Sequence, residues 1–145
     1  MMRHVLQALR ANREDGTLSE ELVKKLYLAV SMANDCGYCT GVYCTLLGED
    51  AGSEAVVREF QRLVVDGELD GFEGDVVEFA IKITNSPHDV TDEDFEYLRE
   101  THGVSDREFV QIVYIVNLIS GYNRVTTVFD CEYEDVYHDG PWMRI

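Results

Sequence analysis

Two cysteines separated by two residues are the side chains of this 145-residue sequence best suited to chemistry. Cys36 and Cys39 form a Cys-x-x-Cys motif, and the apolar segment 26–34 that precedes it contains no Pro or Gly. A close pair of thiols can cycle between dithiol and disulfide, or it can supply half of the ligands of a metal site. The motif therefore predicts either thiol redox chemistry or metal binding.

Metal binding requires more ligands than this motif supplies. A structural zinc site takes four ligands, usually from two such pairs. The other candidates are Cys44, Cys131 and four histidines, which form no second Cys-x-x-Cys and no His-x-x-x-His pair, so we expect no metal. Cys44 lies off the face of Cys39 on a helix and is expected to be a buried small side chain. The alternatives for it are a second disulfide partner or a third metal ligand, and Cys131 is expected to be a packing residue or a free surface thiol.

A helix that begins at the motif would favour redox chemistry. The thiolate is the form of cysteine that attacks a peroxide, and the free N–H groups at a helix N-terminus stabilise an anion. Asn34 and Asp35 can cap such a helix, which would place Cys36 and Cys39 in its first turn. A sulfenic acid on Cys39 would then be within reach of Cys36, which limits overoxidation. This chemistry needs no metal and no organic cofactor.

The elements that must position the motif are predicted to be helices. Apolar spacings of three and four residues, together with capping signals such as Thr17 followed by Glu20, predict an all-α fold of six or seven helices. We expect one domain over residues 1–145, with an irregular tail from about residue 131 and a glycine-rich loop over 67–74. Including their caps, the expected helices cover about residues 5–15, 17–34, 35–48, 53–66, 75–84, 91–102 and 105–129.

Acidic side chains dominate the composition, with 28 Asp and Glu against 12 Lys and Arg and a net charge of -16. Such a charge disfavours binding to nucleic acid and to anionic membranes. The acidic residues are spread along the chain, which favours adaptation to high salt, as in a salt-loving organism, over recognition of a basic partner. The longest uncharged apolar run, 109–122, is too short and too polar to span a membrane. Because the first residues hold no apolar signal core, we expect a cytoplasmic protein, whose thiols are kept reduced.

Residues 22–39, and residues 79–94 with their continuation to 124, together resemble the AhpD-like, or carboxymuconolactone decarboxylase, family. Residues 22–39 are similar to the family helix that leads into its Cys-x-x-Cys motif, with LAVSMANDCGYC at 28–39. Residues 79–94 read FAIKITNSPHDVTDED and, with matches continuing to residue 124, resemble the peroxidase-related subgroup. The resemblance implies a helical domain that forms homo-oligomers and reduces hydroperoxides. It also implies that Cys39 attacks the peroxide, that Cys36 resolves the product as a disulfide, and that an external dithiol or protein reductant restores the pair.

Two positions depart from the proton relay that the resemblance implies. The family commonly has His four residues after the second cysteine and Glu twelve residues before the first, where this chain has Tyr43 and Lys24. A neutral tyrosine is a poor base at neutral pH. Lys24 could stabilise a thiolate by its charge if it points inward, and Glu20 or Glu21 could replace the acid. Together with the two cysteines, Tyr43 and Lys24 are the predicted catalytic residues, and Asp35 and Tyr38 are expected to shape the site.

The sequence therefore predicts a thiol-dependent hydroperoxide reductase or a related disulfide oxidoreductase. The first alternative is a non-catalytic helical oligomer or a redox sensor, in which the relay has decayed and the dithiol reports oxidation. The second alternative is a decarboxylase-like enzyme, which the intact dithiol disfavours because that branch of the family generally does not depend on a Cys-x-x-Cys motif. Turnover with a dithiol donor separates the reductase from the sensor.

Overall fold

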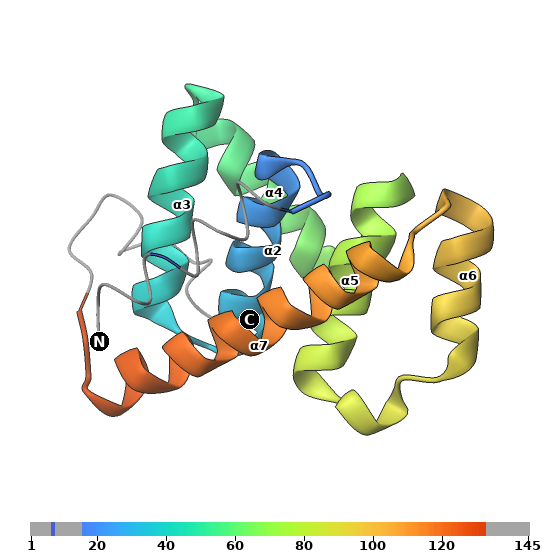
Figure 1. Ribbon diagram of the computed structural model, residues 1–145. Helices are drawn as coiled ribbons and strands as arrows, with labels where there is room; N and C mark the ends of the chain where they lie inside the picture. Colours follow the sequence, from blue (N-terminus) through green and yellow to red (C-terminus); the bar gives the residue numbers. More distant parts are fainter. Residues whose placement is uncertain (1–6, 8–15, 133–145) are drawn as a thin grey trace.

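The computed structural model describes residue 7 and residues 16–132, and within this part the chain is helical (Figure 1). The elements are α2 (Glu20–Ala33), α3 (Gly37–Ala51), α4 (Glu54–Asp66), α5 (Gly71–Asn85), the short 3-10 helix η1 (Pro87–Asp89), α6 (Asp92–His102) and α7 (Asp106–Val128). The predicted all-α fold is confirmed. The predicted helix over 5–15 and most of the predicted tail lie outside the described residues.

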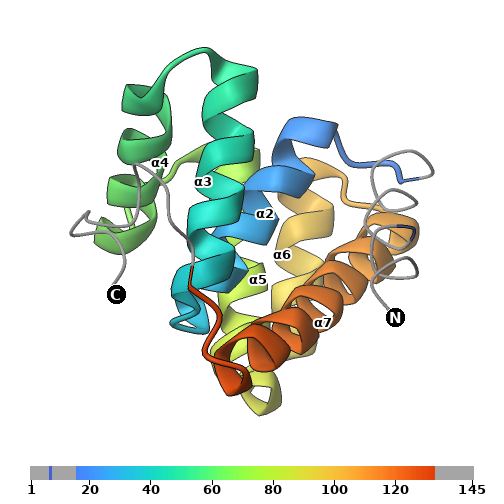
Figure 2. The ribbon, with the colours of Figure 1, turned by 90° about the vertical axis from the view of Figure 1, so that its left-hand side faces the viewer.

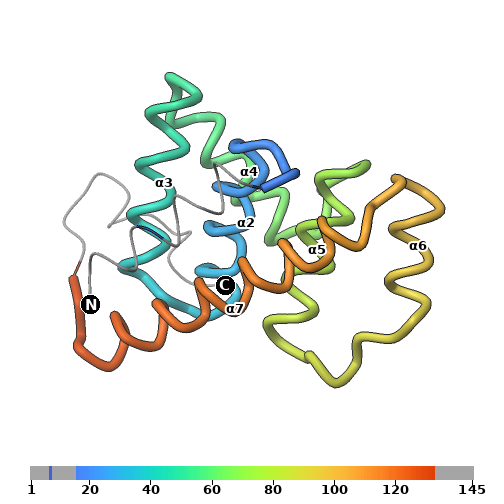
Figure 3. Tube along the Cα trace, viewed as in Figure 1, coloured from blue at the N-terminus to red at the C-terminus, as the bar shows by residue number. Residues whose placement is uncertain are grey.

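The central helix is α2, which packs against α3, α5 and α7. It is apolar on nearly all sides, and Leu26, Leu28 and Val30 are completely buried, as expected for a helix enclosed by others. The longest helix, α7, runs past α5 and α2 to the start of α3 (Figures 1 and 2). The tube in Figure 3 shows α2 and α3 joined by a tight turn, so that they form a helical hairpin. The Cys-x-x-Cys motif lies at this turn, within reach of the end of α7.

Three helix boundaries differ from the sequence prediction, and the first is the end of α3, which lies at Ala51 and not near residue 48. α2 is capped by Ser19, whose hydroxyl accepts the N–H of Leu22 at 3.2 Å, whereas the backbone N–H of Thr17 donates to Gln111 of α7 at 2.8 Å. The helix expected to start near residue 75 starts at Gly71, and Gly74 lies inside it, packed directly on the preceding chain. A Cβ atom at Gly74 would lie 2.4 Å from a backbone oxygen of Leu69. Gly74, which suggested a loop in the sequence, therefore lies within a helix and allows the chain at Leu69 to pack closely against it.

The boundaries of the last two helices agree with the prediction. Thr91 and Ser105 each form a capping box, with Asp94 and Glu108 respectively returning a hydrogen bond to the cap. Three aromatic rings join α5, α6 and α7 in edge-to-face contacts, with centroids separated by 5.0–5.9 Å. These rings belong to Phe79, Phe95 and Phe109. The aromatic cluster fixes one end of α7 and thereby the position of its other end at the dithiol.

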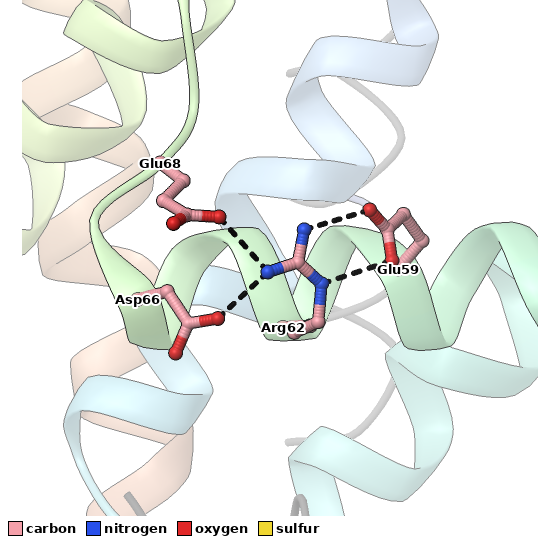
Figure 4. A network of polar contacts seen from close by, with 4 residues as sticks. All are labelled: Glu59, Arg62, Asp66 and Glu68. Carbon is pink, nitrogen blue, oxygen red and sulfur yellow. Dashed lines mark hydrogen bonds and ion pairs between the residues drawn. The ribbon is translucent and has the colours of Figure 1, made fainter.

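On part of the acidic surface, several carboxylates surround one basic side chain. Figure 4 shows the guanidinium group of Arg62 bound to Glu59, Asp66 and Glu68 at 2.8–3.1 Å, a cluster in which three carboxylates share one positive charge. Exposed pairs of this kind add little stability, and salt screens them further. Among the described helices, none is both long and apolar enough to cross a lipid bilayer.

Candidate functional site

The turn between α2 and α3 fixes the backbone of the motif. The N–H of Asp35 donates to the carbonyl of Met32 at 2.9 Å, and the N–H of Cys36 donates to that of Ser31 at 3.0 Å. These two bonds close α2 in a Schellman motif, with Asp35 in the left-handed conformation at a φ of 51°. A glycine usually occupies this position, and Asp is one of the few other residues that tolerate it. The end of α2 therefore determines where Cys36 lies.

Cys36 also begins the next helix. It is the N-cap of α3, and its carbonyl accepts the N–H of Thr40 at 2.9 Å. The expectation that Asn34 or Asp35 would cap this helix is wrong, because Asn34 instead ends α2. Cys39 is the third residue of α3, so the two cysteines flank the first turn and face the same end of the helix.

A hydroxyl from α7 joins the two sulfur atoms. The Oγ1 atom of Thr126 lies 3.2 Å from Sγ of Cys36 and 3.4 Å from Sγ of Cys39. Both cysteines are free thiols, with exposed fractions of 2% and 5%. The sequence analysis did not identify Thr126. The only signal that could have pointed to it was a pair of adjacent hydroxyl residues, Thr126 and Thr127, near the end of the longest helix.

A buried network of amides and hydroxyls holds the end of α2 against α7 behind the thiols. The side-chain amide of Asn34 donates to Ser120 at 3.1 Å and to Asn123 at 2.9 Å. Asn123 in turn donates to the hydroxyl of Ser31 at 3.1 Å. Because these contacts cross between the two helices, they fix the distance between the dithiol turn and the segment that carries Thr126.

The two thiols differ strongly in acidity. The S–H group of Cys39 lowers the pKa of Cys36 from 9.0 to about 5, against the opposing effect of burial and with help from the hydroxyl of Thr126. The neighbouring sulfur of Cys36 and burial together raise the pKa of Cys39 far above its ordinary value. At neutral pH the negative charge therefore resides on Cys36, while Cys39 keeps its proton.

Tyr43 lies beside the dithiol but does not act as a base at neutral pH. Its ring is buried and packs against Tyr27, with centroids 5.2 Å apart. Burial, followed by the closeness of Cys39, raises the pKa of Tyr43 well above its ordinary value, so the hydroxyl stays protonated. Tyr38 is half-buried at the start of the same helix, and Asp35 is exposed.

The structure does not bring Lys24 to the dithiol. Its ammonium group is bound to Asp50 and, at 3.1 Å, to Glu20. Although burial opposes the charge, these carboxylates raise the pKa of Lys24. Asp50 follows Cys39 by eleven residues in α3, which corresponds to about 16 Å along the helix axis. Lys24 thus lines a separate cavity of about 300 Å³ at the far end of the α2–α3 hairpin.

The carboxylates proposed as substitutes for the relay also lie at that end. Glu20 is bound to Lys24, and Glu21 is bound to Lys25 at 2.8 Å. Of the residues proposed from the sequence, Cys36, Cys39 and Tyr43 are therefore brought together, and Lys24, Glu20 and Glu21 form a separate group.

The remaining cysteines lie apart from this chemistry. Cys44 is completely buried, and burial raises the pKa of its thiol to about 12, which fits the expected role of a small core side chain. Cys131 is exposed. Within residues 16–132, no cluster of three or more His, Cys, Asp or Glu side chains is arranged to hold a metal ion.

Comparison with known proteins identifies similar folds. No family model matches the chain, and no curated protein does. A peroxidase-related protein from Silicibacter sp. TM1040 has a TM-score of 0.81 and 21% identity, over 95% of this chain and 72% of that one. The alkylhydroperoxidase AhpD core of a peroxidase-related protein from Ralstonia eutropha JMP134 has a TM-score of 0.81 and 24% identity, over 94% and 72%.

A third structure is more nearly matched in length. It is a protein of unknown function from Agrobacterium tumefaciens, named as a proposed antioxidant defence protein AhpD, with a TM-score of 0.72 and 20% identity over 92% of this chain and 90% of that one. The three likenesses show that the chain has the AhpD-like fold. The fold implied by the sequence resemblance is therefore confirmed.

Proposed function

We propose that this protein is a thiol-dependent hydroperoxide reductase or a related disulfide oxidoreductase of the AhpD-like type. The observation that carries the proposal is the pair of cysteines at the start of α3, whose two sulfurs share the hydroxyl of Thr126. The lowered pKa of Cys36 supports it. The names of the three similar structures, which refer to peroxidases and antioxidant defence, support the same role.

The proposed reaction oxidises the dithiol and reduces the peroxide by two electrons. The thiolate of Cys39 attacks one peroxide oxygen, the O–O bond breaks, and the leaving alkoxide takes up a proton to give the alcohol and a sulfenic acid on Cys39. Cys36 then attacks the sulfur of Cys39, which forms the disulfide and releases water. With one sulfur ionised the dithiol holds one proton, so the alcohol and the water receive that proton, the hydrogen of the hydroperoxide and one proton from solvent. An external dithiol or protein reductant returns two electrons and two protons.

The acidity of the thiols adds one step to this scheme. Because the resting charge lies on Cys36, a proton must pass from Cys39 to Cys36 before Cys39 can attack. The two sulfurs share a hydrogen-bonding neighbour and lie one helical turn apart, so this transfer requires no change of backbone.

The experiment that tests the proposal is single-turnover oxidation. The fully reduced protein is mixed in high salt with one equivalent of an organic hydroperoxide, quenched at short times by alkylation, and the modified cysteines are located by mass spectrometry. We expect rapid formation of a Cys36–Cys39 disulfide that is absent in Cys39→Ser and unchanged in the control Cys131→Ser, which removes the exposed thiol. Oxidation no faster than that of a free thiol would overturn the proposal.

A redox sensor is the second candidate, and the neutral side chain of Tyr43 in place of the relay histidine favours it. A sensor would form the same disulfide without efficient recycling. Steady-state consumption of hydroperoxide in the presence of a dithiol donor separates the two, because the reductase turns over and the sensor stops after one equivalent.

We further propose that the protein is a cytoplasmic homo-oligomer that works at high salt and binds neither nucleic acid nor membranes. The net charge of -16 supports the last three points. Exposed apolar side chains on α7, among them Val110 at 70% and Tyr114 at 47%, support self-association. Light scattering should give a mass above that of one chain, and Val110→Glu should lower it. A monomeric wild-type protein would exclude the oligomer.

A further inference from the structure

The hydroxyl of Thr126 has four possible hydrogen-bond acceptors nearby but only one hydrogen to donate. Besides the two sulfurs, its Oγ1 atom lies 3.0 Å from the carbonyl oxygen of Tyr122 and 3.1 Å from that of Asn123. A hydroxyl donates one hydrogen bond and accepts two. The protonation state of the cysteines therefore decides which partner receives the hydrogen.

Two arrangements satisfy this count. When both cysteines are protonated, or when they are joined as a disulfide, the hydroxyl of Thr126 donates to a carbonyl of α7. When one sulfur is ionised, the hydrogen can turn to that sulfur by rotation about the Cβ–Oγ1 bond alone. The carbonyl that it leaves is little affected, because a helix carbonyl already receives the N–H four residues further along. A hydrogen bond to a charged acceptor is also stronger than one to a neutral carbonyl.

We propose that Thr126 is a positioning residue of the dithiol, whose hydroxyl turns from the backbone of α7 to whichever cysteine sulfur carries the negative charge. It thereby adds to the stabilisation that the thiol of Cys39 gives to the thiolate of Cys36. This inference rests on the proposed function and identifies a hydrogen-bond donor that stabilises the thiolate in that site.

The geometry also explains how the charge can move between the cysteines. The two S···O distances differ by little, 3.2 Å against 3.4 Å, so the same donor reaches either sulfur. Passing a proton from Cys39 to Cys36 therefore exchanges one hydrogen bond from Thr126 for another of similar length. No water or further side chain is needed for this exchange.

Three variants test the role of this hydroxyl. Thr126→Val removes it at nearly constant shape, and Thr126→Ser keeps it. Thr84→Val is the matched control, because Thr84 is also half-buried and its hydroxyl donates to the carbonyl of Ala80, four residues earlier in a helix, at 2.8 Å. Thr84 does not contact the dithiol. Its variant therefore shows how much stability is lost when a comparable helix hydroxyl is removed and the cysteines are unaffected.

The readouts are the lowest thiol pKa, from the ultraviolet absorbance of the thiolate, and the reduction potential of the Cys36–Cys39 disulfide in glutathione buffers. We expect Thr126→Val to raise the thiol pKa by about one unit, a tenfold loss of thiolate at fixed acidic pH. Because the reduced form is then stabilised tenfold less relative to the disulfide, the potential should fall by about 30 mV at neutral pH. Thr126→Ser and Thr84→Val should match the wild type in both.

Two results would overturn the inference. The first is an unchanged thiol pKa and potential in Thr126→Val, even if its melting temperature falls, since Thr126 would then be only structural. The second is a Thr126→Ser variant as altered as Thr126→Val. If the valine variant does not fold, Thr126→Ala compared with Thr126→Ser isolates the hydroxyl in the same way. Neither readout uses a peroxide, so failure of the wild type to react with hydroperoxide would refute the proposed function and leave this inference independently testable.

Discussion

The low pKa of Cys36 is predicted to depend mainly on the thiol of Cys39, and two substitutions separate this effect from the rest of the site. Cys39→Ala removes the hydrogen that is the largest cause of the lowering, whereas Cys39→Ser replaces it with a hydroxyl that can still donate. A hydrogen bond to a charged group is worth about 1.5–3 kcal/mol, and one pKa unit corresponds to about 1.36 kcal/mol. The alanine variant should therefore titrate about one to two units above the value of about 5.

The assay is the rate of alkylation of Cys36 as a function of pH, in a Cys131→Ser background that removes the exposed thiol. Cys44 does not interfere, since burial raises the pKa of its thiol to about 12. In the wild type, reactivity should fall as the pH drops through about 5. In Cys39→Ala the same fall should occur at higher pH, and Cys39→Ser should stay close to the wild type. Equal midpoints in the two variants would refute the assignment of the lowering to the Cys39 thiol.

The same lowered pKa has a predictable effect on stability. Cys36 titrates near 5 in the folded protein and near its ordinary value of 9.0 in the unfolded chain. The folded state thus binds fewer protons between these values, so the free energy of unfolding of the reduced protein should rise with pH across this window. The contribution is complete above the unfolded pKa and is lost as the pH falls through the folded one. The oxidised protein, which has no thiol at this position, should lack this part of the pH dependence.

Three further predictions concern other parts of the molecule. Tyr43→His places an imidazole one turn after Cys39 and should speed oxidation by hydroperoxide at least about tenfold over Tyr43→Phe, measured by rapid mixing; equal rates would undercut the relay explanation. Gln61 is 1% exposed, and its amide has no hydrogen-bond partner among the described residues, so Gln61→Leu should raise the free energy of unfolding in urea by about 1–3 kcal/mol. A decrease would mean that the amide is paired in solution. Finally, the melting temperature should rise between low and molar salt as the net charge of -16 is screened, and a constant value would contradict adaptation to high salt.

Features encoded within a few neighbouring residues were predictable from the sequence. The Cys-x-x-Cys motif is local, and so are the capping boxes at Thr91 and Ser105, which set the starts of α6 and α7. The start of α5 was not predictable, because Gly74 is required by its close approach to Leu69, and glycine by itself indicates a loop.

Features that depend on contacts between distant segments were missed. Thr126 lies ninety residues from Cys36 in the chain, and no spacing rule connects them. The orientation of Lys24 was also undetermined, because its partner Asp50 comes from the far end of the next helix. The sequence could place Lys24 on a helix near the motif, but only the packing of α2 against α3 decides that its ammonium group turns away from the thiols.

Cys36 is hydrogen-bonded to both α2 and α3, so during reduction of the disulfide the reductant must move to the cysteines. Its N–H is held by the end of α2 and its carbonyl by the first turn of α3, so the dithiol cannot swing outward without unwinding both. The two cysteine residues are also almost completely buried, with exposed fractions of 2% and 5%. We expect a donor to reach them only with a slender group, such as a small dithiol or an extended peptide tip, and not with a flat protein surface. The size and shape of the reductant, in addition to the reactivity of its thiol, would then decide which reductants can reduce the disulfide.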